Sequence, residues 1–264
     1  MASAGFYRQL RITILLVVLF FVAMNTWLTE ARTRSWNSTL WMVVYPVNGD
    51  GSRTTQRYID GLTADDFDGI ETFVAAQARG YRVALSDPLT VRLAPQVEHQ
   101  PPMPPAAGGT LSIMLWSLQL RYWAFTHDNY DGPDPDIQMF VVYHDPAENA
   151  RLQHSLGIQK GMIGVVNAFA SPALAARNSV VIAHEFLHTV GASDKYDPAT
   201  NQPLYPIGFA EPQREPLYPQ RLAEIMGGRV PLSAHDAVMP KSLMACSIGT
   251  ETALEIGWIN QEAD

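Results

Sequence analysis

The chain has 264 residues, of which 47% are hydrophobic, and this is enough apolar material for one large domain or two small ones with a real core. Its 18 basic and 26 acidic residues give a formal net charge of −8, with no Lys/Arg-rich run beyond the N-terminus, so nucleic acid is not expected as a partner. The single cysteine, Cys246, excludes an intramolecular disulfide, so the fold depends on its core and on any metal that it binds.

An uncharged apolar segment lies near the N-terminus. Residues 12–28 (ITILLVVLFFVAMNTWL) follow a short tail, residues 1–11, that carries Arg8 and Arg11. The run is longer than the roughly 7–15 residues of a signal-peptide core and is near the lower limit for a helix that crosses a bilayer. It predicts an uncleaved transmembrane anchor followed by a linker over residues 29–38. The positive charge before it favours a single-pass membrane protein with the remainder of the chain outside the cytoplasm. A cleaved signal and secretion are the alternative.

Residues 39–264 predict a single α/β domain without internal repeats. Residues 40–47 are apolar, β-branched and aromatic and end at a turn signal, which indicates a buried strand. A helix is expected to follow Thr63 and to end at Gly80, because acidic residues occupy its first turn. The alternating run 89–94 favours a second strand.

The middle of the domain alternates loops with apolar elements. Residues 100–109 are rich in proline and glycine, and 128–136 are rich in aspartate, so both stretches are expected to be loops. Residues 110–125 lie between them and are long enough to favour a helix over a strand. Residues 137–144 predict a strand, and 160–171 contain another.

The next predicted helix runs from Ser171 or Pro172 to Gly191, although Asn178 or Ser179 could begin a shorter one. The order of elements is then strand, helix, strand, helix, strand, strand and helix. This order predicts a twisted mixed sheet that packs against the last helix.

Two histidines in this last helix indicate a metal site. His184 and His188 are four residues apart, so both imidazoles leave the same face within reach of one ion. Zinc suits this geometry, because it takes neutral imidazole nitrogens and keeps one position for water beside three protein ligands in catalytic sites. Glu185 is too close in sequence to bind the same ion easily, but its carboxylate can take a proton from that water. A chance arrangement is less favoured, because the apolar neighbours of the histidines make unpaired polar groups costly.

The residues after His188 supply a third ligand. Gly191 can take a left-handed conformation and turn the chain back, and Asp194 follows three residues later. The stretch HEFLHTVGASD therefore resembles the H-E-x-x-H-x-x-G-x-x-H signature of the metzincin zinc peptidases. Asp194 replaces the third histidine of that signature, as an aspartate does in the snapalysin-type bacterial peptidases.

The resemblance implies a metzincin-like catalytic domain, and it extends loosely over residues 38–260. It implies that zinc is bound by His184, His188 and Asp194, with Glu185 as the general base. It also implies a Met-turn beneath the metal, for which Met244 lies at a suitable place before a helix expected at 250–258. Ordinary core packing explains Met244 equally well.

Two positions leave alternatives open. Glu224 is a rival third ligand, as in thermolysin-like enzymes, although the short loop after Gly191 favours Asp194. Tyr196 is either a metal ligand, a donor to the transition-state oxyanion, or a packed core tyrosine. A carboxylate ligand makes zinc a poorer Lewis acid than a third histidine does, yet two histidines with a carboxylate are a known catalytic set.

These features predict a membrane-anchored, zinc-dependent endopeptidase that acts on a peptide or protein substrate. The substrate is expected to lie extended along an edge strand, at 160–168 or its neighbour. One alternative is a membrane-tethered zinc-binding module without hydrolase activity, which the presence of Glu185 disfavours. Another is a zinc hydrolase that acts on a non-peptide bond, because the motif specifies an activated water and not its target. The oligomeric state stays open.

Overall fold

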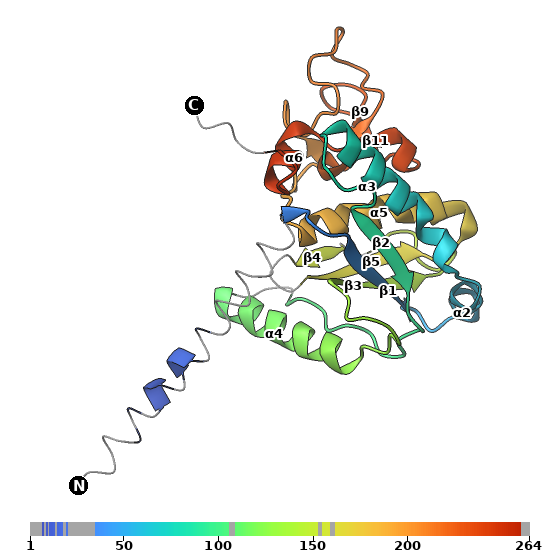
Figure 1. Ribbon diagram of the computed structural model, residues 1–264. Coiled ribbons are helices and arrows are strands. Elements are labelled where there is room, and N and C mark those ends of the chain that lie inside the picture. The colour runs from blue at the N-terminus through green and yellow to red at the C-terminus, as the bar shows by residue number, and fades with distance from the viewer. Residues whose placement is uncertain are drawn as a thin grey trace.

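A five-stranded sheet forms the centre of the molecule, in the order β2, β1, β3, β5, β4 (Figure 1). The computed structural model describes residues 35–105, 109–152, 155–158 and 162–259, with scattered positions between 7 and 20. Strand β1 is parallel to both β2 and β3, and β3 is parallel to β5. Strand β4 is antiparallel to β5. The α/β class and the mixed sheet predicted from the sequence are therefore confirmed. The strands are β1 (Leu40–Asn48), β2 (Leu89–Leu93), β3 (Ile137–His144), β4 (Leu156–Ile158) and β5 (Ile163–Phe169).

Alternate residues of the central strands point to opposite sides of this sheet, and helices cover both of its faces. One core lies between the sheet and the helices α3 (Asp68–Gly80) and α5 (Ala175–Thr189). The other lies between the sheet and α4 (Thr110–Thr126) (Figure 1). In β1, Met42 and Val44 belong to the first core, while Val43 and Tyr45 belong to the second. The result is a three-layer sandwich.

The helices begin and end where local signals allow. Helix α3 follows a 3₁₀ turn, η1 (Ala64–Phe67), at the start of which Thr63 and Asp66 form a capping box. Helix α2 (Arg53–Asp60) is capped by Ser52. Helix α2 was not predicted, because it is short and mostly polar and only two of its residues are buried.

The segment after α5 is built from short elements. Helix α5 begins at Ala175 after a 3₁₀ turn that contains Pro172, and it ends two residues before Gly191. The only regular helix beyond it, among the described residues, is the predicted C-terminal one, α6 (Thr250–Glu255). The remaining elements are β6 (Tyr196–Asp197), β7 (Gln202–Pro203), β8 (Ala223–Glu224), η4 (Ile225–Gly227), β9 (Val230–Pro231), β10 (Ala237–Val238), η5 (Leu243–Ala245) and β11 (Cys246–Ser247).

The transmembrane anchor predicted over residues 12–28 is wrong for the described part of the chain, where no helix is long and apolar enough to cross a bilayer. Residues 14, 18, 19 and 21–28 of that segment lie outside the described residues. The single-pass topology, and the extracytoplasmic placement inferred from it, are therefore not supported.

The end of the predicted linker belongs to the folded domain. Residues 29–34 lie outside the described residues, but Trp36 is buried in the first core. Its Nε1 donates a hydrogen bond of 2.7 Å to the carbonyl of Ile256, and its ring packs edge-on against Trp258. The start of the domain is therefore held against the residues that follow the C-terminal helix α6.

Candidate metal centre

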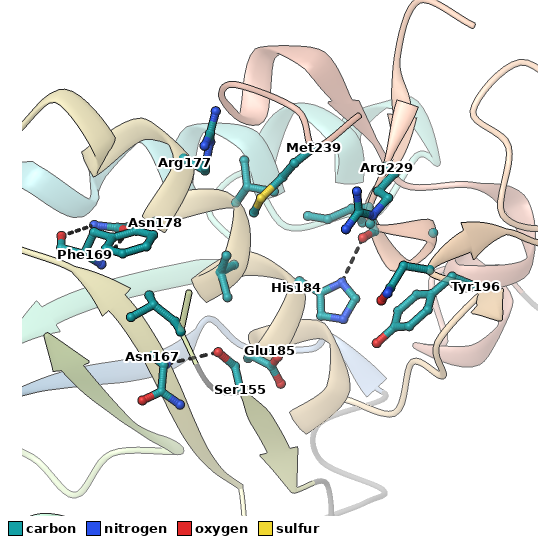
Figure 2. A pocket seen from close by; sticks show the side chains of 17 residues that line it. Ser155, Asn167, Phe169, Arg177, Asn178, His184, Glu185, Tyr196, Arg229 and Met239 are labelled. Carbon is teal, nitrogen blue, oxygen red and sulfur yellow. Dashed lines mark hydrogen bonds between the residues drawn. The ribbon is translucent and has the colours of Figure 1, made fainter. Parts of the chain in front are cut away.

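A cavity of about 380 Å³ lies along helix α5 (Figure 2). Helix α5 contributes His184 and Glu185 to its wall, and strand β6 contributes Tyr196. The turn η4 closes another side with Ile225. Three of the residues predicted for the site therefore line one cavity.

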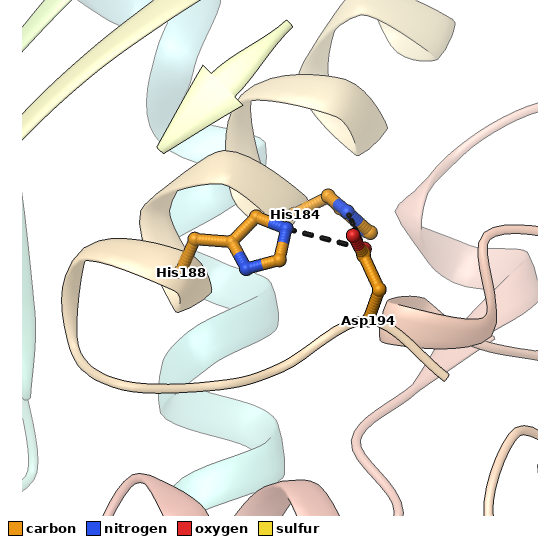
Figure 3. Close-up of side chains that lie close together, drawn as sticks. All are labelled: His184, His188 and Asp194. Atoms are coloured by element: carbon orange, nitrogen blue, oxygen red, sulfur yellow. Dashed lines mark hydrogen bonds and ion pairs between the residues drawn. The ribbon is translucent and has the colours of Figure 1, made fainter. Parts of the chain in front are cut away.

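The predicted metal ligands meet at one end of this helix (Figure 3). The Nε2 atoms of His184 and His188 lie 3.1 and 3.2 Å from Oδ1 of Asp194. The chain returns to the helix at Gly191, whose φ of 111° is one that residues with a side chain rarely adopt. One donor atom from each of the three residues lies within 4.8 Å of the others, so the group is able to hold one ion.

The backbone fixes which nitrogen of each imidazole faces Asp194. Nδ1 of His184 lies 2.8 Å from the carbonyl of Ile225, and Nδ1 of His188 lies 2.8 Å from the carbonyl of Ala192. Because a carbonyl only accepts hydrogen bonds, each Nδ1 carries the proton, and each neutral ring turns an unprotonated Nε2 toward the carboxylate. Two ring lone pairs and a carboxylate oxygen then face one another, and a single metal cation can satisfy all three.

The distances and the donor types fit zinc. A tetrahedral ion at the usual zinc bond lengths separates its ligand atoms by about 3.3 Å. The two distances between histidine and aspartate are close to this value. Two imidazoles and one carboxylate are also a ligand set that catalytic zinc sites use.

Without an ion, protons hold this cluster together. Burial by itself would lower the pKa of His184, but the hydrogen bond with Asp194, the charges of Glu185 and Asp194 and the Ile225 carbonyl together raise that pKa. Burial would raise the pKa of Asp194, but its hydrogen bonds to the two imidazoles lower it well below its usual range. A metal that binds here must therefore displace a proton, so its affinity has to fall as the pH falls.

Glu185 lies beside the cluster, in the same cavity. It is 5% exposed, and its Oε2 has no hydrogen-bond partner among the described residues. Burial raises the pKa of Glu185, although the nearby His184 and His188 oppose the shift. A buried carboxyl group with a raised pKa and an unpaired oxygen is suited to accept and return a proton.

Tyr196 is half-buried on the opposite wall of the cavity (Figure 2). Its ring centroid lies 6.4 Å from that of His184. Burial, the charges of Asp194 and Glu185 and a hydrogen bond to Asp194 together raise the pKa of Tyr196 to about 12. Its hydroxyl therefore keeps its proton at neutral pH and acts as a hydrogen-bond donor.

Glu224, the rival ligand, serves a different part of the structure. Its side chain is fully buried, and Oε1 accepts hydrogen bonds from Gly249 N and Thr252 Oγ1 at 3.1 and 2.7 Å. Its Oε2 accepts a hydrogen bond of 2.8 Å from Gly227 N. The carboxylate joins η4 to the start of α6 and does not belong to the histidine cluster.

Met244, the residue predicted to form a Met-turn, is 92% exposed on η5. The fully buried methionine Met226 lies in η4, directly after the Ile225 carbonyl that accepts from His184. Its own carbonyl accepts a hydrogen bond of 2.9 Å from Lys195 N. The two glycines that follow Met226 were the available turn signal.

Sequence reasoning also missed a clamp on the loop that carries Asp194. Glu255 of α6 accepts hydrogen bonds from Ser193 N and Ser193 Oγ at 2.9 and 2.5 Å. The same carboxylate pairs with Lys195 Nζ at 2.6 Å. The residues on both sides of Asp194 are thus held by one side chain that lies some 60 positions later in the chain.

The short strand β4 was missed as well, and it passes directly over the histidine helix. A Cβ atom on Gly157 would lie 2.5 Å from the Glu185 carbonyl and 2.5 Å from His188 Cβ. Strand β5 pairs on both sides, so the edge strand expected at 160–168 is its neighbour β4. The sheet edge nearest the cluster is therefore β4.

No protein-family model matches the chain, and a search of curated proteins finds no similar sequence. A function for the chain must therefore be inferred from the chemistry of this site.

Proposed function

We propose that the chain is a zinc-dependent endopeptidase in which His184, His188 and Asp194 hold the ion and Glu185 is the general base. One observation carries the proposal. The Nε2 atoms of His184 and His188 converge on the Asp194 carboxylate, while the proton of each imidazole lies on Nδ1. Beside them lies the buried Glu185, one of whose carboxylate oxygens has no hydrogen-bond partner among the described residues. The proposal agrees with the metzincin-like signature of the sequence.

The side chains around the centre have complementary tasks. Zinc, when bound, supplies Lewis acidity and lowers the pKa of a water molecule. Glu185 takes a proton from the attacking water and passes it to the leaving amine, and its raised pKa favours the second transfer. Tyr196 keeps its proton and donates a hydrogen bond to the oxygen on which charge develops.

The edge strand favours a peptide substrate over other bonds. Strand β4 pairs with β5 on one side only, among the described strands, and it lies against the histidine helix. An extended peptide can add to such an edge through backbone hydrogen bonds, which recognise a main chain whatever its side chains are. A non-peptide substrate would make no use of this edge.

The test is hydrolysis of a mixed fluorogenic peptide pool by the zinc-loaded full chain and by its Glu185→Gln variant. We expect the variant to keep its zinc and to lose activity by about 10²–10⁴-fold, the usual contribution of a general base. Glu98→Gln is the matched control, because Glu98 is exposed and lies outside the cavity.

Each other result would contradict a particular part of the proposal. Hydrolysis that survives in Glu185→Gln would remove Glu185 as the base. Zinc binding without hydrolysis by the unmodified chain would favour a zinc-binding module, and a failure to bind zinc would remove the metal centre itself.

A further inference from the structure

The cavity beside the metal centre carries a positive charge that the proposed chemistry does not use. Its charged lining residues, apart from the histidine, are Arg177, Arg229 and Glu185. The chain as a whole has a net charge of −8, so a cavity lined by two arginines differs in charge from the rest of the molecule. Neither arginine belongs to the proposed ligand or proton-transfer groups.

Both guanidinium groups are without an anionic partner in the part of the chain that the structure describes. Arg177 and Arg229 are partly buried, and neither forms an ion pair with a described carboxylate. The hydrogen bond found for Arg229 is a long one, of 3.4 Å, from Nη1 to the carbonyl of Ala237. A partly buried guanidinium pairs most favourably with a carboxylate, which it can bind through two parallel hydrogen bonds.

The positions of the two arginines suit a group close to the reacting bond. In Figure 2 the guanidinium of Arg229 lies on the side of the cavity nearest His184 and Tyr196, and Arg177 lies farther along α5. Arg177 precedes His184 by seven residues, which places it on the same helix face and about 10 Å away along the axis. An extended peptide covers about 10 Å in three residues, so both arginines are within reach of side chains next to the cleaved bond.

Part of the cavity lining is apolar. Val181, Ile225 and Met239 belong to it, and they offer contact for a short aliphatic stem. The cavity of about 380 Å³ is ample for one side chain with a carboxylate at its tip. Apolar walls with cationic groups at two positions favour an acidic side chain over a neutral amide of the same shape.

We propose that this cavity binds a carboxylate of the substrate next to the scissile bond, with Arg229 as its main partner and Arg177 as a second cation along the helix. The inference rests on the proposed peptidase function and adds the class of substrate. The carboxylate has two possible sources, an internal aspartate or glutamate side chain and the C-terminal end of a peptide.

Binding to the zinc-loaded Glu185→Gln chain tests the site without any need for turnover. The probes are labelled peptides with an amidated C-terminus that contain either Glu or Gln at the varied position, and a neutral peptide with a free C-terminus. We expect the Glu peptide to bind about tenfold more tightly than the Gln peptide, the size of one charged hydrogen bond. Tighter binding of the free C-terminus would make the chain end the source of the carboxylate.

Variants assign the preference to its residues. Arg229→Gln should abolish the ratio between the Glu and Gln peptides, Arg177→Gln should reduce it, and Arg229→Lys should keep part of it. Arg53→Gln, which removes an exposed arginine of α2, should leave the ratio unchanged. Thermal denaturation of each variant shows that it is folded.

Equal binding of all three peptides, or a ratio that survives in Arg229→Gln, would overturn the inference. The ratio of kcat/KM for the Glu and Gln peptides, measured with the unmodified chain, distinguishes a failure of the carboxylate site from a failure of the proposed peptidase function. Hydrolysis that depends on Glu185 but not on substrate charge would refute the carboxylate site alone. A Glu preference in binding, with no hydrolysis of any peptide, would refute the peptidase alone.

Discussion

Removal of the Glu255 carboxylate should destabilise the fold and loosen the metal centre together. The ammonium of Lys195 is 1% exposed, and its partners are Glu255 Oε2 at 2.6 Å and the Ser193 carbonyl at 3.1 Å. Glu255→Ala leaves this buried charge with one neutral acceptor and removes the acceptor of Ser193 N and Oγ. The loss of one partner from a buried ion pair costs about 3–5 kcal/mol. Because Glu255 is 26% exposed, we expect a loss of about 3 kcal/mol in the free energy of unfolding.

The same change should reach the metal, because Asp194 lies between the two residues that Glu255 holds. Loss of such a supporting partner typically lowers metal affinity by about 10–100-fold. Urea denaturation of the zinc-free chain measures the first effect, and calorimetric titration with zinc measures the second. Glu251→Ala is the control, because Glu251 is exposed on the same helix.

The pH dependence of this stabilisation has a definite sign. Burial would raise the pKa of Glu255, but its hydrogen bonds with Lys195 and Ser193 outweigh burial and lower it from its ordinary value of 4.5. A carboxyl group whose pKa is lowered by folding stabilises the fold above that ordinary value, and the contribution is lost as the pH falls through the folded pKa. The difference in stability between the unmodified chain and Glu255→Ala should therefore shrink below about pH 4.5.

A double variant separates the unpaired charge from the lost contacts. Lys195→Met combined with Glu255→Leu removes both charges, and it should recover most of the stability that Glu255→Ala loses. An unchanged urea midpoint and an unchanged zinc affinity in Glu255→Ala would refute the clamp.

Three further predictions test the surroundings of the site. Gly157→Ala should lower the free energy of unfolding by about 1–3 kcal/mol, measured by thermal denaturation, because the added Cβ would overlap α5. A Cβ on Gly69 meets no atom within 4 Å, so Gly69→Ala should not destabilise the fold, and equal losses in the two variants would contradict this reasoning. Glu224→Gln should cost about 1–3 kcal/mol and leave zinc affinity unchanged, and a loss of zinc would make Glu224 a ligand after all. Met226→Ala should cost about 2–5 kcal/mol, and Met244→Ala should stay within about 0.5 kcal/mol; the reverse order would restore Met244 as the supporting methionine.

The regular elements could be predicted from the sequence because their signals are local. The strand at 137–144 was predicted with the bounds that the structure has, and the helix at 110–125 differs by one residue. His184 and His188 share a helix face through spacing alone. Gly191 likewise carries the turn that returns Asp194, because its backbone conformation favours glycine.

The remaining features depend on contacts between distant parts of the chain. Glu255 supports the Asp194 loop, and no local pattern relates positions so far apart in sequence. Met226 is fully buried in η4, whose Ile225 carbonyl contacts His184, whereas Met244 lies on a turn that faces solvent. Sequence by itself therefore determined most of the longer elements and the two histidines, since 3.6-residue and 2-residue periods are built into the backbone. Only the tertiary structure decided the supporting residues, the edge strand and the lining of the cavity, because these depend on which surfaces the packed core brings together.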